Sequence, residues 1–314
     1  MSQSNERSAF DQPDGNPPVE GCTAHSLPRI IYAIWFQGLE NAPPMVRANL
    51  SRWRDLNPEY ELRVLDLAQV KSLLADKGLN FEKFRPAALS NIARLELLSR
   101  TGGVWVDATL YPRVPLSAWI NDHFGPEGFF AFRNPGVDRK LAVWFLAVSE
   151  NNPMLLKWKR ELLRFWGEER IYRPIYKIPD DPVATVRPGA GNPDNGYPYF
   201  IFAYLFAYLL EEDADFGERW KRCSELSADP PHALMRRLSA NARIGDEELK
   251  RILDAAPVHK LNWRGSFHPS FLRRVYNEDL WSDGSVNSIL NRFGDEVRWL
   301  GAEFARAAKR RLTS

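Results

Sequence analysis

The chain has 314 residues, of which 44% are hydrophobic and 26% are charged, so it can bury the core of one large domain or two small ones. A formal net charge of +2 excludes a strongly basic nucleic-acid-binding protein, because no overall field would attract a polyanion. The two cysteines, Cys22 and Cys223, are too few and too far apart for a disulfide framework or a cysteine metal site.

Residues 1–27 are rich in Ser, Asn, Asp and Pro and lack the apolar segment of a secretory signal, so we expect a disordered leader. No apolar run is long enough to cross a bilayer, which predicts a cytoplasmic protein. Strand patterns and helix patterns then alternate along the first third of the chain. The strands are expected at 28–36, 61–65 and 104–106, and the helices at 44–53, 66–77 and 86–100. This alternation predicts an α/β fold with a parallel sheet.

The later elements are less regular. We expect strands at 128–132 and 144–148, helices at 153–166 and 199–210, and a long Gly- and Pro-rich loop at 180–198. From about residue 272 the chain reads as a charged helical extension, so the domain boundaries are placed at 28–270 and 271–314. The basic end of that extension could contact anionic lipid, although a solvated terminal helix is the commoner case.

An acidic residue follows the third strand, directly after Gly102-Gly103-Val104-Trp105-Val106. Asp107 should therefore lie at the rim of the sheet, where open α/β folds bind ligands. Thr109 is two residues on and should share its side. A buried carboxylate needs a partner, which could be a ligand (a metal, a phosphate or a sugar hydroxyl) or an arginine of the protein itself. The spacing favours neither alternative.

Three polar residues share one face of the preceding helix: Ser90, Asn91 and Arg94. The apolar residues around them predict that this helix is buried, and a buried arginine needs an anionic partner. Two readings stay open, and spacing alone does not separate them. Arg94 and Asp107 form an ion pair that only holds the fold, or they face a ligand.

Two further positions carry weaker signals. Trp35 ends the first strand and could stack on a nucleobase, although such a tryptophan is more often part of the core. His259 and Lys260 are adjacent, and they combine a common metal ligand with a phosphate-binding cation. An isolated pair of this kind is more often part of a surface strand.

Taken together, these segments resemble the bacterial capsular polysaccharide synthesis glycosyltransferases, which are related to the Och1-like mannosyltransferases and the glucosylating toxins. The resemblance runs in order from about residue 28 to 264. It rests on Pro28 to Gly38, Asn49 to Trp53 with Asn57 to Glu61, Ser90 to Arg94, Gly102 to Thr109, and Val258 to Trp263.

The resemblance implies a GT-A-like, Rossmann-type fold with additional helices. It also implies a retaining glycosyltransferase that transfers a hexose from a nucleotide-sugar donor. The acceptor would be a capsular glycan or its lipid-linked precursor, and the cofactor Mn²⁺ or Mg²⁺. Catalytic roles would fall to Asp107, Arg94 and Lys260, and the metal ligands would be Asp107 and His259. The implied donor-binding set is Trp35, Gln37, Ser90, Asn91, Arg94, Asp107, Thr109, His259, Lys260, Asn262 and Trp263.

Two departures from the family pattern matter. Asn91 stands where relatives often have Asp, and Asp107-Ala108-Thr109 replaces their DxD triplet, so one carboxylate is missing. Two other hypotheses stay open. The missing carboxylate motivates one of them, a non-catalytic subunit that binds a nucleotide sugar or a glycan within an assembly complex. The other is a scaffold in which Arg94 and Asp107 are a structural pair.

Overall fold

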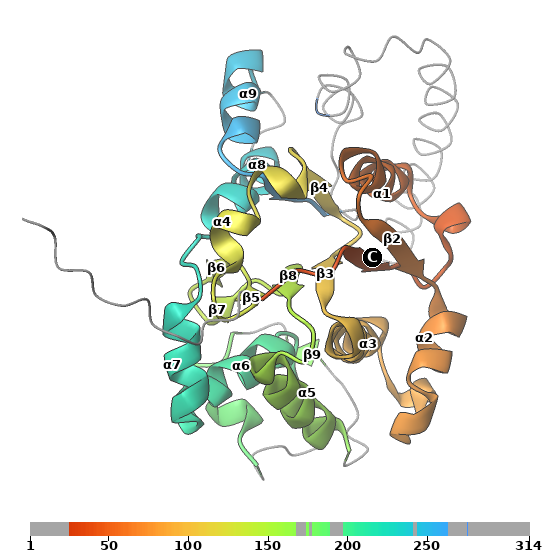
Figure 1. Ribbon diagram of the computed structural model, residues 1–314, viewed down its shortest axis with the longest axis vertical. Coiled ribbons are helices and arrows are strands. Elements are labelled where there is room, and N and C mark those ends of the chain that lie inside the picture. The colour runs from red at the N-terminus through yellow and green to blue at the C-terminus, as the bar shows by residue number, and fades with distance from the viewer. Residues whose placement is uncertain are drawn as a thin grey trace, which may run out of the picture.

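The computed structural model describes residues 25–167, 174–175, 178–188, 197–240, 244–262 and 275. At its centre lies a five-stranded sheet with the strand order β2-β1-β3-β8-β5 (Figure 1). These strands are β1 (Ile30–Ile34), β2 (Glu61–Leu65), β3 (Gly103–Val106), β5 (Phe129–Phe130) and β8 (Phe145–Val148). β1 is parallel to β2 and β3, whereas β8 is antiparallel to β3 and β5. The predicted α/β class is confirmed, and β8 makes the sheet mixed.

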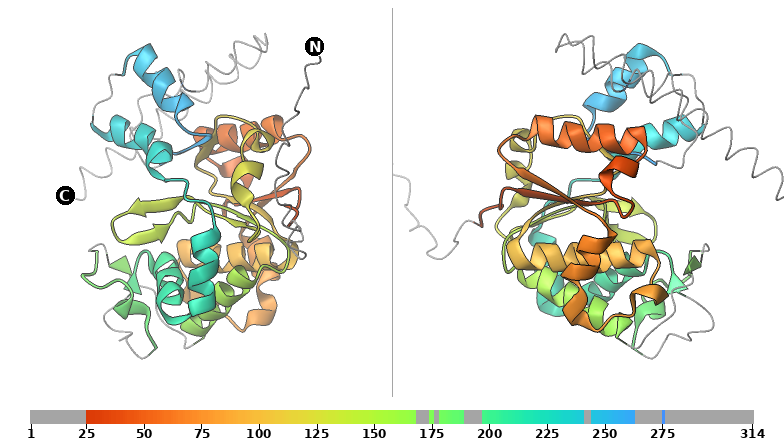
Figure 2. Two further views of the ribbon diagram at one scale, coloured as in Figure 1. Left: turned by 60° about the vertical axis from the view of Figure 1, so that its left-hand side comes forward. Right: turned by 90° about the vertical axis from the view of Figure 1, so that its right-hand side faces the viewer.

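Helices cover both faces of this sheet (Figure 2). α1 (Pro44–Leu56) lies on one face. The helices on the other face are α2 (Leu67–Leu73), α3 (Pro86–Thr101), α5 (Pro153–Trp166), α6 (Ile201–Glu212) and α7 (Ala214–Arg222). The five helices expected between residues 44 and 210 are found, with shifts at some of their ends. The one expected at 66–77 ends as α2 at Leu73, and its N-cap, Asp66, accepts a hydrogen bond from the backbone N–H of Gln69.

Alternation along β3 divides the core into two halves, because successive strand side chains point to opposite faces. Trp105 packs with Tyr32 of β1 in the cluster under α3 and α5. Val104 and Val106 pack in the cluster under α1. All four side chains are almost fully buried, so the end of β3 is held firmly from both sides.

A third layer closes one side of the molecule. β4 (Leu110–Pro112) pairs in antiparallel fashion with β11 (Val258–Lys260). α8 (Asp229–Ala240) and α9 (Asp246–Asp254) pack against this two-stranded ribbon through Leu234, Leu249 and Leu253. The remaining described elements are α4 (Asn121–Phe124), β6 (Arg133–Gly136), β7 (Arg139–Leu141), β9 (Pro174–Ile175), β10 (Tyr197–Pro198) and the short 3-10 turns η1 (Leu39–Asn41), η2 (Ala75–Lys77), η3 (Phe81–Lys83), η4 (Leu116–Ala118) and η5 (Ala184–Val186).

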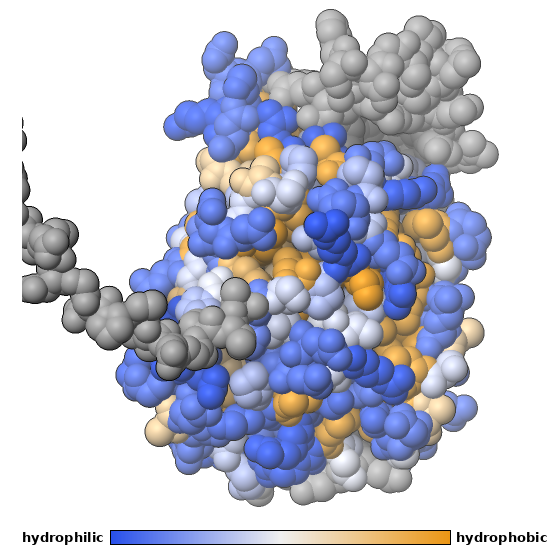
Figure 3. All heavy atoms as spheres, viewed as in Figure 1, coloured by the Kyte–Doolittle hydropathy of each residue, from blue (hydrophilic) through white to orange (hydrophobic). Residues whose placement is uncertain are grey.

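Hydrophilic side chains cover most of the face seen in Figure 3, and apolar ones show between them in small areas. None of the described helices is both long and apolar enough to span a membrane. Most of the expected leader (1–27) and most of the expected C-terminal extension lie outside the described residues, as do Trp263 and part of the loop at 180–198. The domain boundaries therefore stay a prediction.

Candidate functional site

Asp107 lies at the end of β3, and both of its carboxylate oxygens are engaged. Arg94 donates from Nη2 to Oδ1 over 3.1 Å, and the Trp105 indole N–H donates to the same oxygen over 3.1 Å. Lys260 donates from Nζ to Oδ2 over 2.7 Å. The Asp107 side chain is 28% exposed, so this cluster reaches the surface. Two cations around one carboxylate leave one positive charge in excess, which suits an anionic ligand.

Arg94 is buried inside this cluster. Its side chain is 4% exposed, and the guanidinium carbon lies 4.4 Å from the centre of the Trp105 ring and 5.2 Å from that of Phe202. Burial lowers the pKa of Arg94 to about 10 against the opposing effect of Asp107 and Tyr199, so the group stays charged at neutral pH. Within the described structure, Nε and Nη1 are buried without a hydrogen-bond acceptor. Buried donors are rarely left unsatisfied, so Arg94 retains hydrogen-bonding capacity that Asp107 does not use.

Lys260 reaches Asp107 because of the register of the β4–β11 ribbon. His259 pairs with Tyr111 and Lys260 with Leu110, so the two neighbouring side chains point to opposite sides. Lys260 also donates to Thr109 Oγ1 over 2.8 Å, and its side chain is 19% exposed. The structure thus brings four of the predicted site residues, Asp107, Thr109, Arg94 and Lys260, into one cluster.

The cluster favours the charged carboxylate. Burial opposes ionisation of Asp107, but attraction by Lys260 and Arg94 and the hydrogen bonds from Lys260 and Trp105 outweigh it. The pKa of Asp107 consequently lies below its ordinary value. The carboxylate is thus fully ionised at neutral pH and holds both cations in place.

His259 is not brought together with Asp107. Its ring is fully buried against α9, and Nε2 pairs with the Leu253 carbonyl oxygen at 2.9 Å. Burial lowers the pKa of His259 to about 4, so the imidazole is neutral. Asn262, two residues beyond Lys260, is exposed. The sequence could not tell which member of the His-Lys pair faces the site, because that depends on the register with β4.

The remaining predicted residues lie around the same edge of the sheet. Trp35 and Gln37 follow β1, which is parallel to β3. Trp35 is half-buried, and the exposed Gln37 lines a shallow hollow with residues that follow β2, among them Asp66. Ser90 and Asn91 are half-buried one turn before Arg94 on α3.

The predicted metal ligands do not fit a divalent cation. The described residues hold no group of three or more His, Cys, Asp or Glu side chains that could bind one. Lys260 already bonds Asp107 and Thr109, the two polar members of the triplet. Mg²⁺ binds oxygen ligands, and in this structure the ammonium of Lys260 stands at the Asp107 and Thr109 oxygens that would have to supply them.

Two site residues escaped the sequence analysis. Trp105 was assigned only to a buried strand, yet it both orients Asp107 and stacks on Arg94. Its spacing of two from Asp107 placed both on one side of the strand and was the available signal. Trp144 carries no such signal, because its backbone carbonyl accepts the N–H of Asp107.

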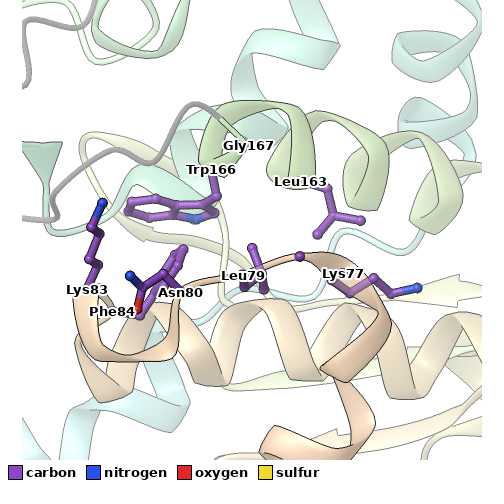
Figure 4. Close-up of a pocket in the computed structure, with 9 residues that line it drawn as sticks. Lys77, Leu79, Asn80, Lys83, Phe84, Leu163, Trp166 and Gly167 are labelled. Carbon is purple, nitrogen blue, oxygen red and sulfur yellow. The ribbon is translucent and has the colours of Figure 1, made fainter.

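A separate pocket lies between the end of α5 and the segment that precedes α3 (Figure 4). Trp166 and Phe84 form its aromatic side, and Lys77, Lys83 and Asn80 its polar side. None of its lining residues belongs to the Asp107 cluster.

Similar proteins were found by sequence and by structure. The O-glycosyltransferase braB of Annulohypoxylon truncatum is 27% identical over 171 residues, which is 48% of this chain and 40% of that protein. The O-glycosyltransferase PaGT of Phomopsis amygdali is 26% identical over 191 residues, or 51% of this chain and 45% of that protein. The chain thus matches less than half the length of these relatives.

Among solved structures, the apo-form glycosyltransferase GlyE of Streptococcus pneumoniae TIGR4 superposes with a TM-score of 0.44 and 12% identity, over 87% of this chain and 64% of that one. The family model described as capsular polysaccharide synthesis protein matches residues 10–181, more than half of the chain. That range includes both Arg94 and Asp107. The chain therefore belongs to the capsular polysaccharide synthesis protein family.

Proposed function

We propose that this protein is a retaining glycosyltransferase of the GT-A type that transfers a sugar, a hexose for instance, from a nucleotide-sugar donor to a surface glycan or its lipid-linked precursor. The observation that carries the proposal is Arg94, a buried cation with two unsatisfied N–H groups beside Lys260 and Asp107. The names of the two fungal relatives support transfer of a sugar. The family description supports a capsular acceptor.

The chemistry follows from the charges of the cluster. When the bond between the sugar and the diphosphate breaks, negative charge develops on the phosphate oxygens of the leaving group. Lys260 and Arg94 would stabilise that charge, and Asp107 would keep both cations oriented before the reaction, so that little reorganisation is needed. In a front-face reaction the leaving phosphate accepts the proton of the acceptor hydroxyl. No protein nucleophile is then required.

The donor would lie along the edge formed by the ends of β1, β2 and β3. The base would stack near Trp35, and the sugar would face Ser90, Asn91 and Arg94. The hollow lined by Gln37 and Asp66 is at this edge and offers polar groups to a ribose. Parallel strands that end together at such an edge are the usual ligand-binding position in open α/β sheets, which supports this orientation.

The first test is thermal unfolding with UDP, GDP, ADP, CDP and their common sugar conjugates. A ligand at about a hundred times its Kd stabilises the fold by roughly 2.7 kcal/mol, so one nucleotide should raise the Tm clearly. Arg94→Gln should abolish that rise. The matched control is Arg133→Gln, because Arg133 also stacks on a tryptophan, at 4.0 Å from Trp220, but satisfies its N–H groups on backbone carbonyls.

A second candidate function is binding of the donor without turnover, and the single carboxylate of the Asp107 triplet favours it. The two candidates differ in one measurement, the release of nucleoside diphosphate from the donor that raises the Tm. Release that is lost in Asp107→Asn indicates an enzyme, and binding without release indicates a binding subunit. For an enzyme, the anomeric configuration of the product, read by NMR, tests retention.

A further inference from the structure

We propose that the ammonium group of Lys260 takes the place of a divalent metal ion, so that this protein binds the diphosphate of its donor without a metal. The inference rests on the proposed function and concerns how the same site handles charge. Lys260 Nζ lies 2.7 Å from Asp107 Oδ2 and 2.8 Å from Thr109 Oγ1. These are the first and third residues of the triplet whose counterpart in DxD relatives carries two carboxylates.

The ammonium and a metal ion would compete for the same atoms. A divalent ion would have to approach Asp107 Oδ2 and Thr109 Oγ1 within about 2.0–2.6 Å. Lys260 Nζ already occupies hydrogen-bonding positions on both oxygens, and two cations at such separations repel strongly. The other carboxylate oxygen, Oδ1, is held by Arg94 and Trp105.

The composition of the triplet fits a monovalent cation. The Asp107 carboxylate accepts from the ammonium, and the neutral Thr109 hydroxyl completes the shell without adding charge. With a second carboxylate at position 109 and no lysine at position 260, the cluster would carry a net negative charge that favours a divalent ion. Threonine at this position therefore matches the lysine on β11, and the two residues form one unit across the β4–β11 ribbon.

Lys260 can still bind a phosphate while it holds the triplet. An ammonium group has three N–H donors, and Asp107 and Thr109 accept from two of them. The side chain is 19% exposed, so the remaining N–H can reach a phosphate oxygen at the surface of the cluster. Arg94, which bonds the other carboxylate oxygen of Asp107, would add a second positive charge close to that phosphate.

The experiment measures the affinity of the full chain for UDP, GDP, ADP and CDP by calorimetry, with EDTA and again with Mn²⁺. A second arm titrates Mn²⁺ alone and follows the free ion by electron paramagnetic resonance. For the wild type we expect one nucleotide to bind with a Kd that changes less than about twofold between EDTA and Mn²⁺, and no Mn²⁺ binding at about 1 mM ion, because no ligand set is open.

Three variants sharpen the test. Lys260→Met keeps an unbranched side chain, shorter by one atom, without the charge, and should raise the Kd about tenfold or more, since a charge-assisted hydrogen bond to phosphate is lost. Lys157→Ala is the control, because Lys157 pairs with Asp213 and Asp215 outside the cluster, and it should leave the Kd unchanged. Lys260→Ala combined with Thr109→Asp restores two carboxylates and should bind Mn²⁺ and the nucleotide only with that ion present.

The outcomes separate the two proposals. Nucleotide binding by the wild type that needs Mn²⁺, or Mn²⁺ bound by the wild type alone, overturns the metal-free inference but leaves the donor site standing. No nucleotide binding with or without Mn²⁺ overturns the donor site, and with it the role of Lys260. Because the wild-type arms decide between these results, a variant that fails to fold does not remove the test.

Discussion

At the scale of single residues, the charged side chains of the site fix one another's positions through ion pairs and hydrogen bonds. Asp107 fixes Lys260 and Arg94, and Trp105 fixes both Asp107 and Arg94. The ion pair between Arg94 and Asp107, expected from sequence as a structural alternative to ligand binding, is present. It does not satisfy Arg94, however, because two N–H groups remain without an acceptor in the described structure. The two readings are therefore compatible.

His259 gives a pH prediction at this scale. Its pKa in the fold, about 4, lies below the ordinary 6.5 because burial disfavours the imidazolium. The stability that its neutral form contributes is complete above pH 6.5 and is lost as the pH falls toward 4, by up to about 3 kcal/mol. We expect His259→Asn to be less stable at pH 7.5 and to lose less between pH 6.5 and 4, as measured by urea unfolding at each pH. Parallel losses in both proteins would assign the titration to another group.

At the scale of elements, prediction succeeded where a pattern is long. The sequences of α3 and α5 each run over several helical turns and contain many apolar residues. Their predicted bounds agree with the structure to within one residue. β4 and β11 have three residues each, too few for an alternation to be recognised. β6 contains Pro135 and Gly136, which normally mark loops. The pairing of β4 with β11, which places Lys260 beside Asp107, therefore could not be predicted from local sequence, although Lys260 itself was named as a candidate.

Gly102 follows α3 and Gly103 begins β3, and the geometry of Gly103 gives an element-scale prediction. Gly103 has φ +105, and a Cβ there would lie 2.7 Å from the Ile30 carbonyl oxygen in β1. Gly103→Ala should therefore lower the free energy of unfolding by more than about 2 kcal/mol, through strain and a displaced strand. Urea unfolding of the purified variant measures this loss.

Gly78 supplies the control for that experiment. It has φ +65 but nothing within 4 Å of the added Cβ, so Gly78→Ala should lose only about 1 kcal/mol from backbone strain. Equal losses of unfolding free energy in the two variants would show that the contact of the added Cβ with β1 does not destabilise Gly103→Ala.

At the scale of the whole molecule, the cluster joins distant parts of the chain. The family match at 10–181 contains Arg94 and Asp107 but ends before Lys260. Lys260 is placed beside them by the third layer, through the pairing of β11 with β4. The predicted α/β class needed only the alternation of the first hundred residues. The complete site needed a contact between residues 107 and 260, which no local pattern encodes.

The near-neutral charge of the whole chain gives a prediction on salt. With a formal net charge of +2, long-range attraction of a nucleotide is weak, and the excess charge is local to the cluster. Because partly buried charges are screened little, the Kd of the bound nucleotide should rise less than about tenfold between 50 and 300 mM NaCl. Calorimetry at the two salt concentrations measures this change. A steeper rise would show that further basic residues contact the ligand.

The pairing of β4 with β11 also bears on how the protein is made. Lys260 follows Asp107 by 153 residues, so at a synthesis rate of 5–20 residues per second it is added roughly 8–30 s later. During that interval a nascent chain has Arg94 and Asp107 but not the ammonium group that bridges the triplet. An unfinished polypeptide therefore lacks half of the positive charge of the site, and the cluster is complete only after residue 260 has been added and β11 has paired with β4.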